Sequence, residues 1–208
     1  TIAKNHSLLR DPGSVLARYD DNPLRQDIEE IGRLVDIHFA LNVVMNDDKE
    51  IVAAFAGDPW SVIEASIPWV RRIYEVPVSQ PFDVMITCPG GYPKDINLYQ
   101  AHKAVSCANR VTKEGGKIIL VAACEDGVGS RGYAQYMARG FDSHEEVMAQ
   151  FVKETFRIGP HKAYIFGRDA VRLEDILIVS DIDPAQIREL LLTPASLGEA
   201  VAGAIGPL

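Results

Sequence analysis

The sequence is poor in the features that mark membrane proteins and nucleic-acid-binding proteins. No run of 18 or more apolar residues occurs in its 208 residues, and no charged-then-apolar signal segment opens it. Basic residues are also fewer than acidic ones: the sequence has 21 Lys and Arg and 29 Asp and Glu, which gives a formal net charge of -8. Phosphate binding needs clustered Lys and Arg, so we expect no nucleic-acid partner. These absences favour a cytoplasmic protein, not associated with a membrane, that acts on small molecules.

Cysteine is scarce as well. Cys88, Cys107 and Cys124 are widely spaced, and no C-x-x-C pair suggests a zinc site. We expect all three to be buried, reduced thiols that pack as small hydrophobic groups. The apolar share of the chain, 47%, is enough to fill the core of one large domain or two small ones.

The first eighty residues carry two helical patterns around a predicted hairpin. The stretch "NPLRQDIEEIGRLV" has helical spacing and opens at Asn-Pro. The turn cluster "NDD" separates two β-rich runs, "VDIHFALNVVMN" and "DKEIVAAFAGD", which predicts a β-hairpin. A second helix is expected over "PWSVIEASIPWVRRIY", kinked or interrupted at Pro68. The segment "VPVSQPFD" then marks the best domain boundary.

Beyond this boundary, strand and helix patterns alternate. The expected elements are a strand at 83–88, a helix at 95–112, a strand at 117–123, helices near 133–139 and 143–157, and a strand at 162–166. A further strand in "VRLEDILIVS" and helices in "DPAQIRELLL" and "SLGEAVAGAI" complete the chain. This order predicts parallel strands joined by crossover helices, which is an α/β fold.

The loop that opens "PGGYPKDINLYQAHKAV" is the first candidate site. Ligands of open α/β sheets bind where strands end and helices begin. Gly90 and Gly91 allow backbone torsions and close approach that a side chain would forbid, and free amide groups at the following helix would suit a small carboxylate. We interpret Asp95 as the cap of that helix.

Gln100 and Lys103 are the candidate substrate contacts. They stand three residues apart and share one face of the predicted helix, away from its apolar stripe. An amide and an ammonium so placed suit the hydroxyl and carboxylate of a small acid. Taken alone, however, the spacing favours a solvated polar face.

Two other features are weaker. Gly127, Gly129 and Gly132 in "EDGVGSRG" match the G-x-G-x-x-G dinucleotide pattern, but the helix pattern after them is short. We interpret them as a tight loop on the substrate side, with an NAD-dependent oxidoreductase as the alternative. His6 stands alone near the start of the chain, and residue spacing by itself indicates no metal site.

Several of these segments, in this order, resemble the nickel-pincer lactate racemase family: "TIAKNHSLL", "DNPLRQDIEEI", "GGYPKDINLYQAHKA" and "EGGKIILVAACEDGVGS". The resemblance runs from Thr1 to about Ala170. It implies the C-terminal half of such a protein, with the α+β end of the cofactor domain at 1–78 and a parallel-sheet, Rossmann-like domain at 79–208. The start at Thr1 also leads us to expect a fragment.

The resemblance implies a reaction and roles for particular residues. His6 would coordinate nickel, Gln100 and Lys103 would hold the substrate, and the loop at Gly90 and Gly91 would bring them close to the cofactor. That cofactor would be a nickel-pincer nucleotide, pyridinium-3,5-bisthiocarboxylic acid mononucleotide. Hydride transfer to and from it would invert a 2-hydroxy acid. The tethering lysine, two acid–base histidines and a substrate-binding arginine would precede Thr1, so we expect this chain alone to be inactive.

One departure from the family concerns the substrate. Near Val147 to Gln150, where the resemblance leads us to expect a substrate-contacting tryptophan, the sequence reads "EVMAQF". Without that aromatic wall the pocket is larger, so a bulkier hydroxy acid or a sugar acid is an alternative to lactate. A third interpretation is a non-catalytic module that binds a small acid.

Overall fold

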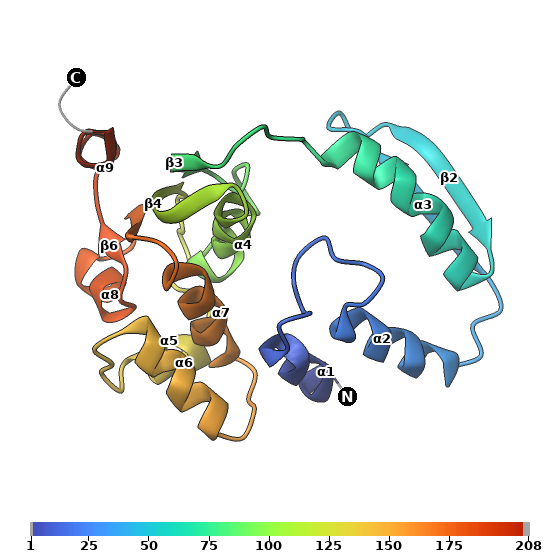
Figure 1. Cartoon of the computed structure of the whole chain (residues 1–208), viewed down its shortest axis with the longest axis horizontal. Helices are drawn as coiled ribbons and strands as arrows, with labels where there is room; N and C mark the ends of the chain where they lie inside the picture. Colours follow the sequence, from blue (N-terminus) through green and yellow to red (C-terminus); the bar gives the residue numbers. More distant parts are fainter. Residues whose placement is uncertain (1, 206–208) are drawn as a thin grey trace. The chain divides into compact units, whose positions relative to one another are not determined.

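The computed structural model describes residues 2–205 and divides into two compact units (Figure 1). One, which we call the sheet unit, contains the chain up to Pro12 and from Gln80 onward; the other, the hairpin unit, contains Gly13–Ser79. The first segment of the chain thus folds with the sheet unit. The functional division at 78/79 stays a prediction. Thr1 and residues 206–208, which that division includes, lie outside the described residues.

The hairpin unit consists of the elements expected from its sequence. Helix α2 (Pro23–Arg33) begins after Asn22, whose side chain accepts a hydrogen bond from the Leu24 amide. Strands β1 (Ala40–Met45) and β2 (Ile51–Gly57) pair antiparallel as the predicted hairpin. Helix α3 (Pro59–Tyr74) continues through Pro68, where an interruption was expected, and packs against both strands. That packing supports the helix across the proline.

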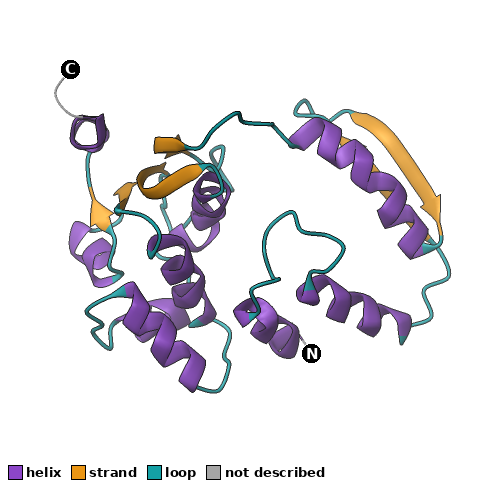
Figure 2. Ribbon diagram, in the orientation of Figure 1, coloured by secondary structure: helices purple, strands orange, loops and turns teal. Residues whose placement is uncertain are grey.

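A four-stranded parallel sheet organises the sheet unit, in the order β3-β4-β5-β6 (Figure 2). Its strands are β3 (Phe82–Thr87), β4 (Thr112–Val121), β5 (Asp175–Val179) and β6 (Thr193–Pro194). Its helices are α1 (Ile2–Ser7), α4 (Leu98–Asn109), α5 (Arg131–Met137), α6 (His144–Lys153), α7 (His161–Ala170), α8 (Pro184–Glu189) and α9 (Leu197–Ile205), with a 3₁₀ turn, η1, at Leu8–Arg10. The predicted α/β class is confirmed.

Apolar side chains lie on both faces of this sheet. Ile118 and Leu120 of β4 are fully buried in the main core, whereas Ile119, between them, joins a smaller cluster with Leu177 and Ala200. Successive side chains of a strand point to opposite faces, so α9 covers one face, and helices α4 to α8 contribute to the main core on the other. This is the near-continuous apolar pattern of a strand buried on both sides.

The expected strand at 162–166 is wrong, because these residues belong to helix α7. The stretch Ala163–Phe166 is a short apolar run, and such a run does not distinguish a strand from a buried helix. Within α7, Ala163, Tyr164, Phe166 and Gly167 are all buried, which explains the resemblance to an interior strand.

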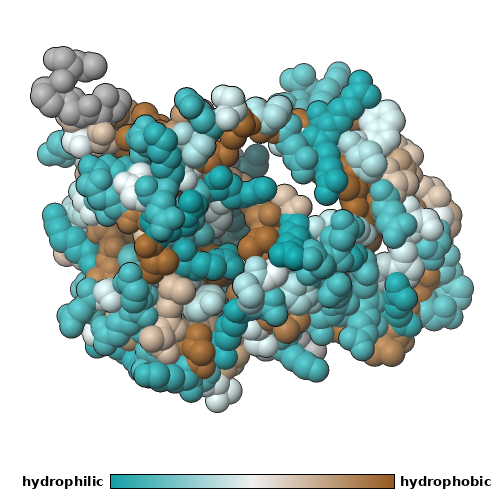
Figure 3. All heavy atoms as spheres, in the orientation of Figure 1, coloured by the Kyte–Doolittle hydropathy of each residue, from teal (hydrophilic) through white to brown (hydrophobic). Residues whose placement is uncertain are grey.

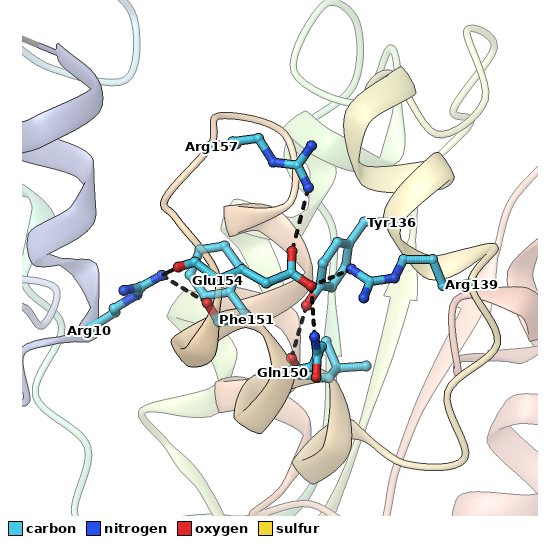
Figure 4. A network of polar contacts seen from close by, with 8 residues as sticks. Arg10, Tyr136, Arg139, Gln150, Phe151, Glu154 and Arg157 are labelled. Carbon is cyan, nitrogen blue, oxygen red and sulfur yellow. Dashed lines mark hydrogen bonds and ion pairs between the residues drawn. The ribbon is translucent and has the colours of Figure 1, made fainter.

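The first segment is fastened to α6 through Arg10 (Figure 4). One guanidinium nitrogen of Arg10 donates to the carbonyl oxygens of Phe151 and Glu154, at 2.8 and 3.2 Å. The guanidinium also lies over the Phe151 ring, 4.7 Å from its centroid. The Glu154 carboxylate in turn binds Gln150, Arg139 and Arg157. These contacts hold the segment that carries His6 against the end of α6.

Among residues 2–205, no helix combines the length and apolar character needed to cross a membrane.

Candidate functional site

The candidate site is a pocket between the end of β3 and one face of α4. Its volume is about 500 Å³. It is lined by Thr87, Cys88, Pro89, Lys94, Gln100, Lys103, Ala104 and Cys107. The pocket thus lies at the carboxyl end of a parallel strand, as expected for an open α/β sheet.

Gln100 and Lys103 both lie on the wall of this pocket and contact each other. The ammonium of Lys103 donates to Oε1 of Gln100 at 2.7 Å. This contact leaves the amide NH₂ group of Gln100 and the remaining hydrogens of Lys103 as donors. The structure therefore brings together the two predicted substrate contacts in an orientation suited to an anionic or hydroxyl-bearing ligand.

Gly90 and Gly91 form the turn that leads from β3 toward α4. Their φ angles are +92° and +76°, a region that other residues rarely adopt. No crowding requires glycine at Gly91, since an added Cβ would meet nothing within 4 Å. The two glycines are therefore explained by backbone conformation, and their predicted contact with a cofactor stays a prediction.

The expectation of free amide groups at the start of α4 is wrong. The helix begins at Leu98, and its first amides donate to the carbonyl oxygens of Gly127 and Val128, at 2.9 and 3.1 Å. Asn97, and not Asp95, is the cap, since its side chain accepts from the Gln100 amide. Asp95 instead accepts from the Ala123 amide at 3.4 Å. A carboxylate bound here must be held by side chains.

The loop after β4 that contains Gly127, Gly129 and Gly132 packs closely against the start of α4 and the segment before α7. A Cβ on Gly129 would lie 2.1 Å from the Asn97 side chain, and one on Gly132 would lie 3.2 Å from Cα of Gly159. Both glycines therefore permit the close approach of other parts of the chain. These contacts explain Gly129 and Gly132 without a dinucleotide.

The prediction of three buried cysteines is right for one of them and wrong for two. Cys124 is buried, and burial raises the pKa of its thiol to about 11. Cys88 and Cys107 are exposed and line the candidate pocket. Cys107 lies one helical turn beyond Lys103 on the same face of α4. It therefore belongs to the pocket face of the helix and not to its buried face.

His6 lies against a second histidine that the sequence did not single out. The rings of His6 and His161 meet edge to face, with their centroids 5.7 Å apart. On its other side, Nε2 of His161 lies 3.4 Å from the hydroxyl oxygen of Tyr99, the residue before Gln100. Burial, helped by His6 and Lys162, lowers the pKa of His161 to about 4. The structure thus links His6 to the start of α4 through His161 and Tyr99.

A search of the described residues finds no group of three or more His, Cys, Asp or Glu side chains arranged to hold a metal ion. The imidazole of His6 is a donor that suits nickel, so His6 fits the role of one ligand to a nickel-containing cofactor, which would need further donors beside it.

A buried polar cluster between α4 and α7 was also missed by sequence reasoning. Nε2 of His102 lies 3.1 Å from Asp169, without the alignment of a hydrogen bond, and burial lowers the pKa of His102 to about 4. The Asp169 carboxylate accepts from Ser106 at 2.6 Å and from Asn109 at 3.2 Å. Lys162, beside this cluster, is only 6% exposed. The signal in the sequence was the charged residue inside "HKAYIF", whose other members are largely apolar.

Val147, near which the family tryptophan was expected, is fully buried in the main core and does not line the pocket. The substrate inference drawn from that segment stays a prediction.

Comparison with known proteins identifies the family. The family described as "Lactate racemase C-terminal domain" matches residues 78–206, more than half of the chain. The chain belongs to this family. Lactate racemase from Lactiplantibacillus plantarum is 32% identical over 206 residues, which are 97% of this chain and 48% of that protein. Lactate racemase from Thermoanaerobacterium thermosaccharolyticum is 29% identical, over 96% of this chain and 48% of that protein.

Solved structures show the same fold, and one of them is a lactate racemase. The lactate racemase apoprotein from T. thermosaccharolyticum superposes with a TM-score of 0.90 at 28% identity, covering 98% of this chain and 50% of that one. A structural-genomics protein from Thermotoga maritima has a TM-score of 0.65 at 16% identity, covering 86% of this chain and 48% of that one, which shows the fold alone. The chain spans about half the length of the curated relatives that it matches.

Proposed function

We propose that this chain is part of a 2-hydroxy acid racemase or epimerase that works with a nickel-pincer nucleotide. The family match over residues 78–206 carries the proposal, and the curated relatives that align with nearly the whole chain are named lactate racemase. The two predicted substrate contacts share one pocket wall, which agrees with it.

In this proposal Gln100 and Lys103 bind and orient the acid. The ammonium of Lys103 neutralises the substrate carboxylate, and the NH₂ group of Gln100 donates to the carboxylate or the hydroxyl. The hydrogen bond between the two side chains holds them in place before the substrate arrives, so they lose little conformational entropy on binding. Because the α4 amides are engaged by loop carbonyls, these side chains carry the recognition.

His6 is the proposed nickel ligand, and it is a positioning residue for the metal without a role in proton transfer. When bound, the nickel-pincer nucleotide supplies the group that accepts and returns a hydride at the α-carbon of the acid. The edge-to-face contact with His161 fixes the plane of the His6 ring, as neighbours of metal-ligating histidines commonly do. The tether and the acid–base groups would come from outside this chain, so we predict no turnover by these 208 residues alone.

The test is the intact mass and nickel content of the complete protein, isolated from cells that make the cofactor. We expect a mass increase equal to that of the pincer nucleotide and about one nickel per chain. Replacing His6 by Ala should lower the nickel content. The matched control is His38→Ala in the hairpin unit, where the side chain is 81% exposed and nickel content should not change.

The other interpretations give different results in the same preparation. Unmodified, nickel-free protein that still binds lactate would identify a non-catalytic module for small acids. Thermal protection by NAD, without protection by a hydroxy acid, would identify an oxidoreductase. The use of Gly129 and Gly132 for close packing speaks against this last interpretation.

A further inference from the structure

Lys162 is a buried cation whose charge is not matched by a counter-ion. Its ammonium lies over the Tyr99 ring, 4.7 Å from the centroid, and 5.9 Å from the centroid of Phe166. Within residues 2–205 it has no ion pair and no side-chain hydrogen bond, although its residue is only 6% exposed. The ammonium nitrogen is not among the fully buried side-chain atoms without a partner, so it keeps some contact with solvent. This contact and the aromatic faces offset part of the cost of holding a charge here, but no counter-ion among the described residues completes it. Such a group indicates a ligand that supplies the missing charge.

The nearest carboxylate is already engaged. Asp169 affects Lys162 electrostatically, yet its two oxygens accept hydrogen bonds from Ser106 and Asn109 and face His102. The buried carboxylate therefore belongs to the polar cluster between α4 and α7, and it is not the ionic partner of Lys162.

The polar groups next to Lys162 in His161 and Tyr99 are hydrogen-bond donors. Nδ1 of His161 accepts from the Gly159 amide at 2.9 Å, so a neutral ring carries its proton on Nε2, which faces the Tyr99 hydroxyl. Burial, together with electrostatic repulsion from the Lys103 ammonium, lowers the pKa of Lys162 to about 8. The Lys162 ammonium, an imidazole N–H and a phenol thus lie together at the start of α7.

The turn that presents these donors is rigidly built. Gly159 has a φ of +104°, and a Cβ there would lie 3.0 Å from Cα of Gly132. This backbone contact fixes the segment before α7, so His161 and Lys162 are held in place before any ligand binds.

We propose that Lys162, with His161 and Tyr99, forms a second carboxylate subsite, and that the substrate is a 2-hydroxy acid with two carboxylates. This inference rests on the proposed function, in which Lys103 and Gln100 bind the first carboxylate. The second carboxylate completes the charge of Lys162, so an acid with two carboxylates is preferred over lactate, which has one. A monocarboxylic acid leaves Lys162 unpaired and binds more weakly.

The test is calorimetric titration of the 208-residue chain with lactate, 2-hydroxysuccinate and inorganic phosphate. We expect 2-hydroxysuccinate to bind at least about tenfold more tightly than lactate. Lys162→Met should remove that preference while the affinity for lactate stays within about twofold. Lys103→Met should weaken both acids. The matched control is Lys153→Met, which removes an exposed lysine from neighbouring α6.

Folding of the variant is checked by its thermal transition without ligand. Lys162→Met should unfold at a higher temperature than the parent chain, because it removes an unpaired buried charge and keeps an apolar stem of similar length. Lys162→Gln provides a second variant with the same expected loss of preference.

Three results would overturn the subsite: equal affinity of the parent chain for both acids, a preference that survives in Lys162→Met, or no binding of any acid by the chain. Phosphate binding as tight as that of 2-hydroxysuccinate would show a general anion site and would overturn the substrate assignment. None of these results changes the nickel and mass measurements, which test the proposed function separately.

Discussion

The two units of this chain differ in how completely they bury their apolar side chains. The sheet unit has a continuous core in which residues such as Tyr133, Phe166 and Leu98 are almost fully buried. Among the described residues of the hairpin unit, the buried apolar side chains are Val44 and Val62. Hydrophobic colour is visible over β2 in the space-filling view (Figure 3). The hairpin unit therefore has regular helices and strands but leaves much of its apolar surface exposed.

The exposed apolar residues of the hairpin unit follow its whole length. They include Ile28, Leu34, Val35, Phe39, Leu41, Ile51, Trp69 and Val76. Because the curated relatives are about twice as long as this chain, we propose that the remaining part of the protein, the predicted N-terminal domain, covers this surface. In this proposal the sheet unit is stabilised by its own core, whereas the apolar surface of the hairpin unit is buried only in the complete protein.

The largest expected effect tests the core directly. Phe166→Ala should lower the free energy of unfolding by about 3–5 kcal/mol, because it opens a cavity beside His102 and Tyr133. The matched variant Phe39→Ala, at a side chain 66% exposed, should change it by less than about 0.5 kcal/mol. Denaturant titration of the 208-residue chain measures both. Equal losses would remove the contrast between the units, whereas a large loss for Phe39→Ala in the complete protein alone would strengthen it.

The next effect concerns the pocket of the sheet unit. Lys103→Ala in the complete protein should reduce transition-state stabilisation by about 2–4 kcal/mol, since the charge that neutralises the carboxylate is lost. Chiral analysis of lactate and of a dicarboxylic hydroxy acid measures the rate. Lys153→Ala serves as the exposed-lysine control. An unchanged rate would exclude Lys103 from the site.

Acid should affect the sheet unit through His102. The pKa of His102 is about 4 in the folded state, below its ordinary value near 6.5, because the buried ring resists charge. The unfolded chain therefore binds a proton first as the pH falls, and stability decreases between pH 6.5 and pH 4. The expected loss from pH 7 to pH 5 is about 2 kcal/mol. His102→Gln should flatten this part of the stability profile, measured by circular dichroism; an unaltered slope would assign it to other groups.

The smallest effect belongs to the hairpin unit. Asp58→Ala removes the cap of α3, where the carboxylate accepts from the Ser61 amide, and should cost about 1 kcal/mol. Both tryptophans of the chain, Trp60 and Trp69, lie in α3, so tryptophan fluorescence follows this unit selectively. Asp58→Asn keeps a capping side chain and should restore most of the loss. Coincident transitions by tryptophan fluorescence and by circular dichroism in this variant would show that the two units unfold together.

Much of the fold could be predicted because its signals are local. The hairpin followed from a turn cluster between β-rich runs, and β3 and β5 followed from apolar runs of strand length. The strand prediction at 162–166 was wrong because a buried helix and a buried strand can carry the same short apolar run. The pairing of the α4 amides with Gly127 and Val128 is a contact between distant segments, and no local pattern indicates it.

The candidate site was predictable to a similar extent. Three-residue spacing places Gln100 and Lys103 on one helix face, and the resemblance to the racemase family singled them out as substrate contacts. In the structure both side chains line the same pocket. Their roles, and that of His6, stay predictions. His161 and Lys162 were missed because a charged residue usually indicates solvent exposure, and only the packing of α7 against α4 shows that Lys162 is buried.

The engagement of the α4 amides by loop carbonyls has a consequence for how this protein changes during evolution. Backbone amides at a helix start are present whatever the sequence is, whereas side chains can be replaced one at a time. Under the proposed function, recognition at this pocket falls to side chains of α4, so single codon changes can alter the preferred acid while β3, β4 and their loops stay as they are. The sheet and its loops thus provide a constant frame on which new substrate preferences can arise by small steps.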